Sequence, residues 1–317
     1  MIDDLKIENI LELIDPKKIR VYQPTRIIFI CGGKTDVTAT SPTSLRDAFM
    51  RVAYSSDFEK YQPMLAEELD AFFPKGDYKD FLSLESDIAQ ISTLVLLFSE
   101  SFGSAAELGA FAMVHEISHK ILVVIDDKRY GENSFIKLGP IRAIENANGD
   151  GAICVVNHGD LGIEEISDLS NLDTKFFSKL LKDAIAFRQK KIPEHSSFNP
   201  SYSGHMIKLI VGLIQWYGAL TVDEIETALY CLDASCTVAR INDYLLCAEF
   251  AKWIVAHKRG VQTFFVAMPT DNVAVQFSPK AEKKMLGRVR WQAEVRAYWK
   301  EHDILRFRAI SDVMKDA

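Results

Sequence analysis

Hydrophobic and polar positions follow two different patterns along the chain, and the change falls near residue 200. The first half holds four apolar runs of strand length, in RIIFICGG, TLVLLFSES, KILVVIDD and GAICVVN. Segments with helical spacing stand between them, such as DFLSLESDIAQIS, where Leu82, Ile88 and Ile91 are expected to face inward. Strands that are apolar on both faces and alternate with helices are typical of a parallel sheet covered on both sides. The pattern predicts an α/β fold with a doubly wound parallel sheet.

The second half has longer amphipathic periods. HMIKLIVGLIQWYG, TVDEIETALYCL and TVARINDYLLCAEF predict three helices, and WIVAHKRGVQTFFVAMP with VAVQFS predicts a β-hairpin after them. Three helices followed by a hairpin is the order of a winged helix-turn-helix domain. The third helix offers only Arg240 and Lys252 to phosphates, fewer than a major-groove reader usually carries.

These patterns predict five parts. They are an N-terminal helix within residues 1–25, an α/β domain at 26–160, a helical linker at 161–200, a winged helix-turn-helix domain at 201–280 and a basic C-terminal helix at 281–317.

Composition narrows the classes of protein to consider. The 317 residues carry a net charge of −7, which argues against a surface devoted entirely to nucleic acid. No apolar run reaches the roughly 18 residues that cross a bilayer, so we expect a cytoplasmic protein without a membrane partner. The 5 cysteines include no CxxC pair, and free thiols are expected.

The tail has the opposite charge balance to the whole chain. Residues 280–308 hold nine Lys/Arg against four Asp/Glu, together with aromatic side chains. Lysine and arginine neutralise phosphates and aromatic rings stack on unpaired bases. Arg288, Arg290 and Trp291 are therefore candidates for contact with nucleic acid or a partner, although a solvated amphipathic helix explains them equally well.

Two loops after predicted strands are candidates for ligand binding, since doubly wound sheets bind ligands beyond the carboxyl ends of their strands. One loop contains Cys31, Gly32 and Gly33, and the other spans residues 99–103. The second leads into a helix whose first turns carry Glu107 behind small residues only. A carboxylate there suits attack at a sugar anomeric carbon. A capping or surface glutamate is the alternative reading.

The segments FICGG, SLESDIAQIS and ESFGSAAELGAFA resemble the nucleoside 2-deoxyribosyltransferase family, whose motif D-S-G-T-A-x-E-x-G-x-A supplies a glutamate nucleophile. Glu107 matches that nucleophile, and Glu85 matches the position of an aspartate that orients the base. The resemblance assigns substrate contacts to Cys31, Gly32, Gly33, Ser101, Gly103 and Ser104. Those transferases also use residues from a neighbouring subunit, which implies a homo-oligomer.

Within that superfamily, ESFGSAAELGAF, the later SFIKLGPIR and the predicted winged helix are similar to effector toxins of bacterial retrons. These anti-phage systems hold the effector in check with a reverse transcriptase and its multicopy single-stranded DNA. The resemblance implies an N-glycosidase, inactive until phage infection, that cleaves NAD or a (deoxy)nucleotide as substrate and needs no cofactor. The departing pyridinium of NAD requires no general acid, so one carboxylate can suffice.

Two other readings remain open. A DNA-binding regulator could use the same α/β domain only to sense a nucleotide-like ligand. A zinc peptidase could use HEISH (115–119), since H-E-x-x-H on a helix places two zinc ligands and a general base on one face. No metal is expected, because the other histidines show no recognisable third-ligand pattern.

Overall fold

The computed structural model describes residues 11–316, and its chain forms two compact units. Unit 2 contains Thr25–Leu69 and Ser92–Pro193; unit 1 contains the described residues up to Pro24, Asp70–Ile91 and the chain from Glu194 onward. Residues 1–10 of the predicted N-terminal helix lie outside the described residues. The division differs from the predicted boundaries, because residues 70–91 group with the C-terminal half.

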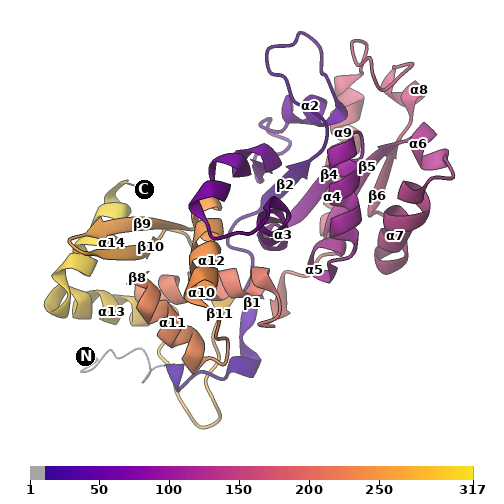
Figure 1. Ribbon diagram of the computed structural model, residues 1–317. Helices are drawn as coiled ribbons and strands as arrows, with labels where there is room; N and C mark the ends of the chain where they lie inside the picture. The colour runs from indigo at the N-terminus through magenta and orange to yellow at the C-terminus, as the bar shows by residue number, and fades with distance from the viewer. Residues whose placement is uncertain (1–10, 317) are drawn as a thin grey trace. The chain divides into compact units, whose positions relative to one another are not determined.

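Unit 2 is built on five parallel strands (Figure 1). They are β2 (Ile27–Cys31), β3 (Gln62–Leu65), β4 (Leu94–Phe98), β5 (Ile121–Asp126) and β6 (Ile153–Val156), in the order β3-β2-β4-β5-β6. The predicted α/β fold with a parallel sheet is confirmed, and the strand order is the one found in flavodoxin-like sheets, with a switch point between β2 and β4. The four predicted strands are all present, and β3 was not predicted.

The helices of unit 2 cover both faces of its sheet. They are α2 (Leu45–Met50), α4 (Phe102–Ala112), α5 (His115–Ser118), α6 (Asp127–Gly131), α7 (Arg142–Asn148), α8 (His158–Leu161) and α9 (Thr174–Gln189), with the short turns η2 (Ala66–Ala71) and η4 (Lys137–Ile141). Figure 1 shows α4 crossing in front of β4.

Strand alternation sorts the side chains between the faces. Ile28 and Ile30 of β2 join a core cluster with Phe49 of α2 and Leu181 of α9. The alternate positions of β2 therefore point to the other face, and the last of them is Cys31. Helix α9 falls in the segment predicted as a linker, but it packs into this core.

Unit 1 contains the remaining elements. They are η1 (Pro16–Lys18), β1 (Arg20–Tyr22), η3 (Phe73–Lys75), α3 (Phe81–Ile91), β7 (His195–Ser197), α10 (Ser203–Tyr217), β8 (Ala219–Leu220), α11 (Val222–Cys231), α12 (Val238–Phe250), β9 (Ile254–Arg259), β10 (Gln262–Ala267), β11 (Val275–Gln276), α13 (Arg288–His302) and α14 (Ile304–Asp316). Two small antiparallel sheets have the orders β11-β1-β7 and β8-β10-β9.

Several predictions for unit 1 need correction. The hairpin lies wholly within residues 254–267, and Val275 pairs instead with Val21 of β1. In α3, Leu82 is half exposed, whereas Leu84 is buried. The basic tail forms two helices rather than one. Among the described residues, no helix is long and apolar enough to span a membrane.

Candidate active site

Glu107 lies on the face of α4 that turns toward the sheet. The helix begins at the cap Ser101, whose side chain accepts a hydrogen bond from the Ser104 amide. Ser104, Leu108 and Phe111 are buried and spaced as one helical stripe. Glu107 is three residues after the first and four before the last of them, so the periodicity that buries the helix also carries this carboxylate inward.

Three side chains from other elements influence Glu107. The Cys31 thiol, at the end of β2, hydrogen-bonds to its carboxylate, and the charges of Arg46 on α2 and Glu67 on η2 act on it. Burial raises the pKa of Glu107 to about 6, Arg46 opposes that rise and Glu67 adds to it. Near neutral pH the carboxylate is therefore mostly ionised but only weakly stabilised.

The two oxygens of Glu107 differ in their surroundings. Oε2 is shielded from solvent and has no hydrogen-bond partner among the described residues. A buried carboxylate oxygen without a donor is energetically unfavourable and rare in folded proteins. Together with its raised pKa and its position at the switch point, this makes Glu107 a candidate for a reacting group.

Arg46 is held rigidly beside this carboxylate. It is 2% exposed, donates to the carbonyl of Gly33 at 3.2 Å and pairs with Glu67. Its Nε has no hydrogen-bond partner among the described residues. A fixed guanidinium supplies positive charge where a sugar phosphate or a developing negative charge could lie. Sequence reasoning missed Arg46 and Glu67, because only the fold brings them to α4.

A second, partly buried carboxylate, Glu100, fills the loop that was predicted to approach a ligand. Its Oε1 accepts from the amides of Gly33 and Arg46, each at 3.0 Å, and its Oε2 accepts from Leu45 at 2.8 Å. These donors include the free N–H groups at the start of α2, the part of a helix that otherwise attracts phosphate. The protein thus supplies its own anion here, a role that the sequence did not reveal.

Gly32 and Gly33 are small because the packing around them is tight. A Cβ on Gly32 would stand 2.8 Å from the Cβ of Phe98, and one on Gly33 would stand 2.8 Å from Glu100 Oε1. Close packing within the protein accounts for both glycines. Their predicted contact with substrate stays a prediction.

The small residues that open α4 divide into two groups. The hydroxyls of Ser101 and Ser104 hydrogen-bond to each other at 3.0 Å in a reciprocal capping box, so both have a structural role. Gly103 is exposed, and a Cβ there would have only the Ser101 hydroxyl within 4 Å, at 3.8 Å. Their predicted substrate contacts are not tested by this geometry.

Glu85 belongs to a different unit from the residues around Glu107. It is buried on α3, which belongs to unit 1, whereas Cys31, Arg46 and Glu67 lie with Glu107 in unit 2. Its predicted role in orienting the base remains a prediction.

Two of the three candidate contact residues in the tail remain accessible. Arg290 is exposed and pairs with Glu294 at 3.2 Å, and Arg288 is half-buried. Trp291 is 5% exposed, and its Nε1 donates to the carbonyl of Trp216 at 3.0 Å. Its ring packs within unit 1 and is not free to stack on a base.

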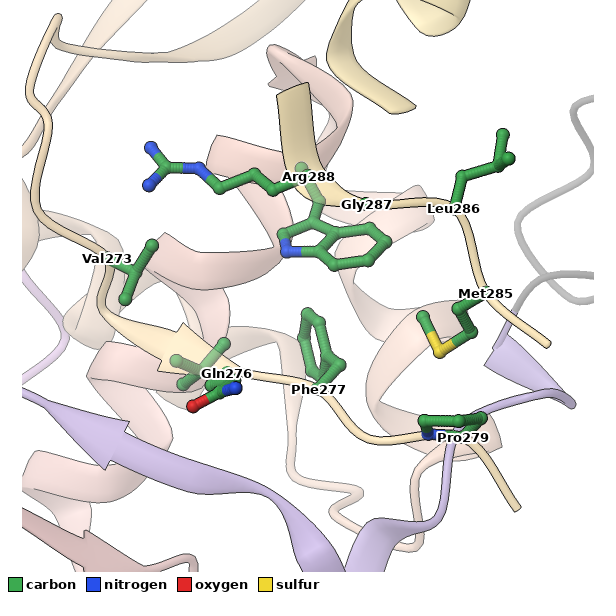
Figure 2. A pocket seen from close by; sticks show the side chains of 10 residues that line it. Val273, Gln276, Phe277, Pro279, Met285, Leu286, Gly287 and Arg288 are labelled. Carbon is green, nitrogen blue, oxygen red and sulfur yellow. The ribbon is translucent and has the colours of Figure 1, made fainter. Parts of the chain in front are cut away.

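Unit 1 also has a cavity of about 430 Å³, shown in Figure 2. Its wall is mostly apolar and is formed by Trp216, Val273, Val275, Gln276, Phe277, Pro279, Met285, Leu286, Gly287 and Arg288. Arg288 is anchored beside it by the carbonyls of Asp271 and Thr270. This cavity is formed by unit 1 alone and contains none of the residues around Glu107.

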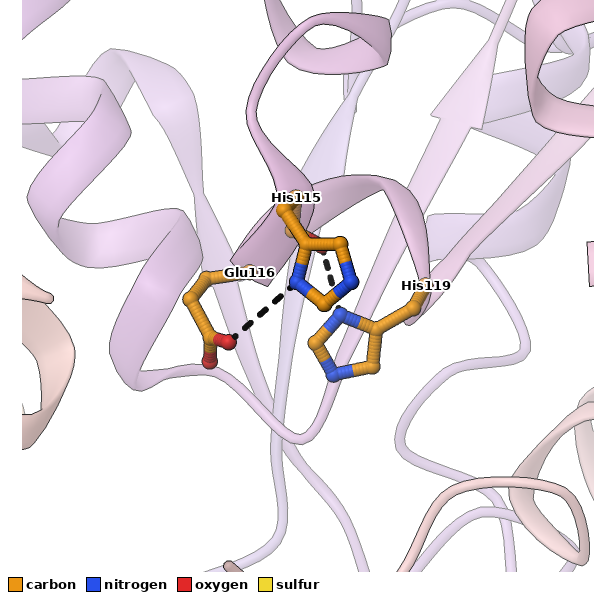
Figure 3. Close-up of side chains that lie close together, drawn as sticks. All are labelled: His115, Glu116 and His119. Atoms are coloured by element: carbon orange, nitrogen blue, oxygen red, sulfur yellow. Dashed lines mark hydrogen bonds and ion pairs between the residues drawn. The ribbon is translucent and has the colours of Figure 1, made fainter. Parts of the chain in front are cut away.

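The HEISH segment lies on α5, separated from the end of α4 at Ala112. Figure 3 shows His115, Glu116 and His119 turned toward one another. The His119 Nδ1 lies 2.6 Å from the carbonyl of His115. Glu116 interacts with the buried Lys120, whose pKa is lowered to about 8 by burial. An ammonium group therefore already balances this carboxylate, and α5 ends after a single turn.

Comparison with known proteins gives the family. Residues 42–256, more than half of the chain, match the family described as STM3845 retron effector protein. The "putative ribosyltransferase/DNA-binding protein" of Escherichia coli retron Ec86 is 31% identical over 166 residues, which are 51% of this chain and 50% of that protein. The protein so described in E. coli retron Ec73 is 25% identical over 149 residues, 46% of this chain and 47% of that protein. The chain spans about half the length of the curated relatives it matches. The predicted kinship with retron effectors is thereby confirmed, and the chain belongs to the STM3845 retron effector family.

Proposed function

We propose that this retron effector is an N-glycosidase of the nucleoside deoxyribosyltransferase type, with Glu107 as its nucleophile. The observation that carries the proposal is the buried, unpartnered Oε2 of a carboxylate with a pKa of about 6 beside the switch point of a doubly wound sheet. The E. coli relatives described as ribosyltransferases support the same class of reaction.

The proposed reaction has two steps, formation of a covalent bond between Glu107 and the sugar and then its cleavage. A Glu107 oxygen bonds to C1′ of NAD or a (deoxy)nucleotide while the C1′–N bond breaks and its electron pair leaves with the base. Water or another acceptor then attacks C1′ and releases the carboxylate; its proton passes to solvent when nicotinamide has left and to the departed base anion when the substrate is a nucleotide. The Cys31 thiol donates a hydrogen bond to Glu107, and the positive charge of Arg46 keeps part of it ionised below neutral pH.

Unit 1 is proposed to be the regulatory part. Its order of α10, β8, α11, α12 and the β9–β10 hairpin, with β8 pairing to β10, fits a winged helix. The description of the relatives as DNA-binding also favours this assignment. The reverse transcriptase and its multicopy single-stranded DNA would hold the enzyme inactive until phage infection.

The third helix of this domain is committed to internal contacts. Arg240 of α12 pairs with Asp87 of α3 at 2.7 Å, and the Cys247 thiol lies 3.0 Å from the Tyr78 hydroxyl. Asp243 accepts from the amide of Asp77 at 2.8 Å. Most residues of this helix are buried, which leaves little of its surface to lie in a major groove. The proposed domain therefore docks partners through other surfaces, and a DNA-binding regulator that reads duplex DNA through α12 is the weaker alternative.

Product analysis tests the proposal. Purified protein and its Glu107→Gln variant are incubated with NAD and a panel of nucleosides and nucleotides, and the products are identified by mass spectrometry. Release of nicotinamide or a free base by the wild type alone supports the N-glycosidase and identifies its substrate. No release from any compound by the wild type, with tight binding of one of them, favours the sensing regulator.

A further inference from the structure

A second cluster of polar side chains lies on unit 2, at the carboxyl ends of β5 and β6. Asp126 is the last residue of β5, Asp127 follows it, and His158 begins α8 just after β6. One ligand atom from each of the three lies within 4.8 Å of the others. None of them takes part in the proposed chemistry of Glu107.

The imidazole has an unsatisfied nitrogen aimed into this cluster. His158 is 6% exposed, and its Nδ1 lies 3.2 Å from the carbonyl of Glu164, which can only accept a hydrogen bond. Nδ1 therefore carries a proton. The Nε2 atom lies 3.6 Å from Asp126 Oδ1 and 3.8 Å from Asp127 Oδ1, without a hydrogen bond among the described residues.

Of the two carboxylates, Asp127 has an unpartnered oxygen facing the imidazole, whereas the facing oxygen of Asp126 accepts one hydrogen bond. Asp127 Oδ2 accepts a hydrogen bond from the side-chain Nδ2 of Asn157 at 2.6 Å, but its buried Oδ1 has no partner among the described residues. Asp126 Oδ1 accepts from the Arg129 amide at 3.0 Å, and its Oδ2 lies 3.4 Å from the Arg129 Nε. A neutral Nε2 lone pair facing two carboxylate oxygens is repulsive unless a proton or a metal cation lies between them.

The neighbouring cations do not fill this gap. Lys128 is drawn away to Glu165 at 2.9 Å, and the Arg129 side chain lies on the far oxygen of Asp126. A cation about 2.1 Å from an imidazole nitrogen and a carboxylate oxygen would leave these atoms about 3.0 to 3.4 Å apart. The observed separations exceed this by a few tenths of an ångström, within a small side-chain adjustment.

We propose that Asp126, Asp127 and His158 bind one divalent transition-metal cation, of the Mn²⁺ or Zn²⁺ class. One imidazole and two carboxylates suit these ions better than Mg²⁺, which prefers oxygen ligands and retains its waters. Asp127 is partly exposed and provides the route for the ion.

The site is connected to the loop before α4. Arg129, anchored on Asp126, donates from its Nη1 to the carbonyl of Ser99 at 3.0 Å. Ser99 begins the strand-to-helix turn, which continues through Glu100 to the cap Ser101. A bound cation would therefore stiffen the edge of the sheet from β6 to β4, and its binding does not depend on the proposed activity.

The test is a titration of the metal-free protein with Mn²⁺, in which electron paramagnetic resonance measures the free ion, together with a parallel Zn²⁺ thermal-shift series. We expect one strong Mn²⁺ site in the wild type and at least about tenfold weaker binding in Asp127→Asn and His158→Gln. Asp160→Asn is the matched control, because it removes an exposed carboxylate of α8 outside the cluster.

His115→Gln controls for the other histidine cluster, and the strong site is expected to survive it. The Asp127→Asn variant is expected to fold, because this side chain is only partly buried. Circular dichroism checks its folding independently of metal binding. Equal binding by all the variants, loss in His115→Gln alone, or no binding by folded wild type up to about millimolar Mn²⁺ would overturn the proposal. The last result would mean that a proton on Nε2 occupies the gap.

Discussion

Glu100 and Glu107 lie on either side of the start of α4, and burial raises the pKa of both. Their partners differ. Glu100 accepts three backbone N–H bonds and closes the start of α2, whereas Glu107 has one oxygen without a donor. Burial and a raised pKa alone therefore do not identify a reacting carboxylate here. The difference in partners assigns one glutamate to structure and leaves the other available for chemistry.

The largest expected effect is on turnover in Glu107→Gln. The amide keeps the shape of the side chain but is a very poor nucleophile, so we expect base release to fall about 1000-fold or more. The free energy of unfolding should change little, because the loss of a buried charge stabilises the protein and the weakening of the Cys31 hydrogen bond destabilises it. Initial rates and thermal unfolding are compared with Glu132→Gln, an exposed glutamate on the same unit. Rates in Glu107→Gln within tenfold of wild type would mean that another group reacts.

The next largest effect is on stability in Glu100→Gln. The new amide group can accept with its oxygen, but its NH₂ must then face at least one of the N–H donors of Gly33, Leu45 and Arg46. We expect a loss of about 2 kcal/mol in the free energy of unfolding, measured by urea titration. An unchanged midpoint would remove the structural role assigned to Glu100. Turnover per folded molecule should fall far less than in Glu107→Gln.

The pH dependence of activity separates the two carboxyls further. Because burial raises the pKa of Glu107 to about 6, the reactive ionised form is lost below that pH. We expect kcat/KM to fall about tenfold per unit below about pH 6 and to be flat up to about pH 8. The pKa of Glu107 in the folded protein, about 6, lies above its ordinary value of 4.5. Stability therefore decreases as pH rises from about 4.5 to about 6, since the unfolded chain ionises first. An activity that does not decline between about pH 7 and 5 contradicts the assignment.

Glu67→Gln should give the smallest effect. Glu67 is about half exposed, pairs with Arg46 and raises the pKa of Glu107 through its negative charge. Removing its charge should move the acid limb of the rate profile down by about half a pH unit, with little loss of stability. Glu68→Gln, the neighbouring exposed glutamate, is the control. A shift to higher pH would contradict the charge arrangement described around Glu107.

The sequence predicts the sheet of unit 2 better than it predicts the site. Four strands are continuous apolar runs, which only burial on both faces explains, whereas β3 contains Gln62 and Pro63 and lies at the sheet edge. Glu107 could be found from the sequence because its helix directly follows the loop of small residues after β4. The motif resemblance then gave this glutamate a role.

The rest of the site depends on contacts between distant segments. Arg46 and Glu67 meet Glu107 only because α2 and η2 return to the same edge of the sheet. Glu100 reads as a loop residue in the sequence, since its three amide partners lie more than 50 positions away. Trp291 illustrates the converse: its aromatic ring near basic residues suggested base stacking, but the fold places it against Trp216.

The measurement that tests the central claim most directly is the location of a covalent sugar on the protein. The substrate identified by product analysis is mixed with wild-type protein, the reaction is quenched in acid during turnover, and peptides are sequenced by mass spectrometry. The account predicts a glycosyl group on Glu107 and none on Glu100. A glycosyl group on another residue, or product formed at the wild-type rate by Glu107→Gln, would contradict it.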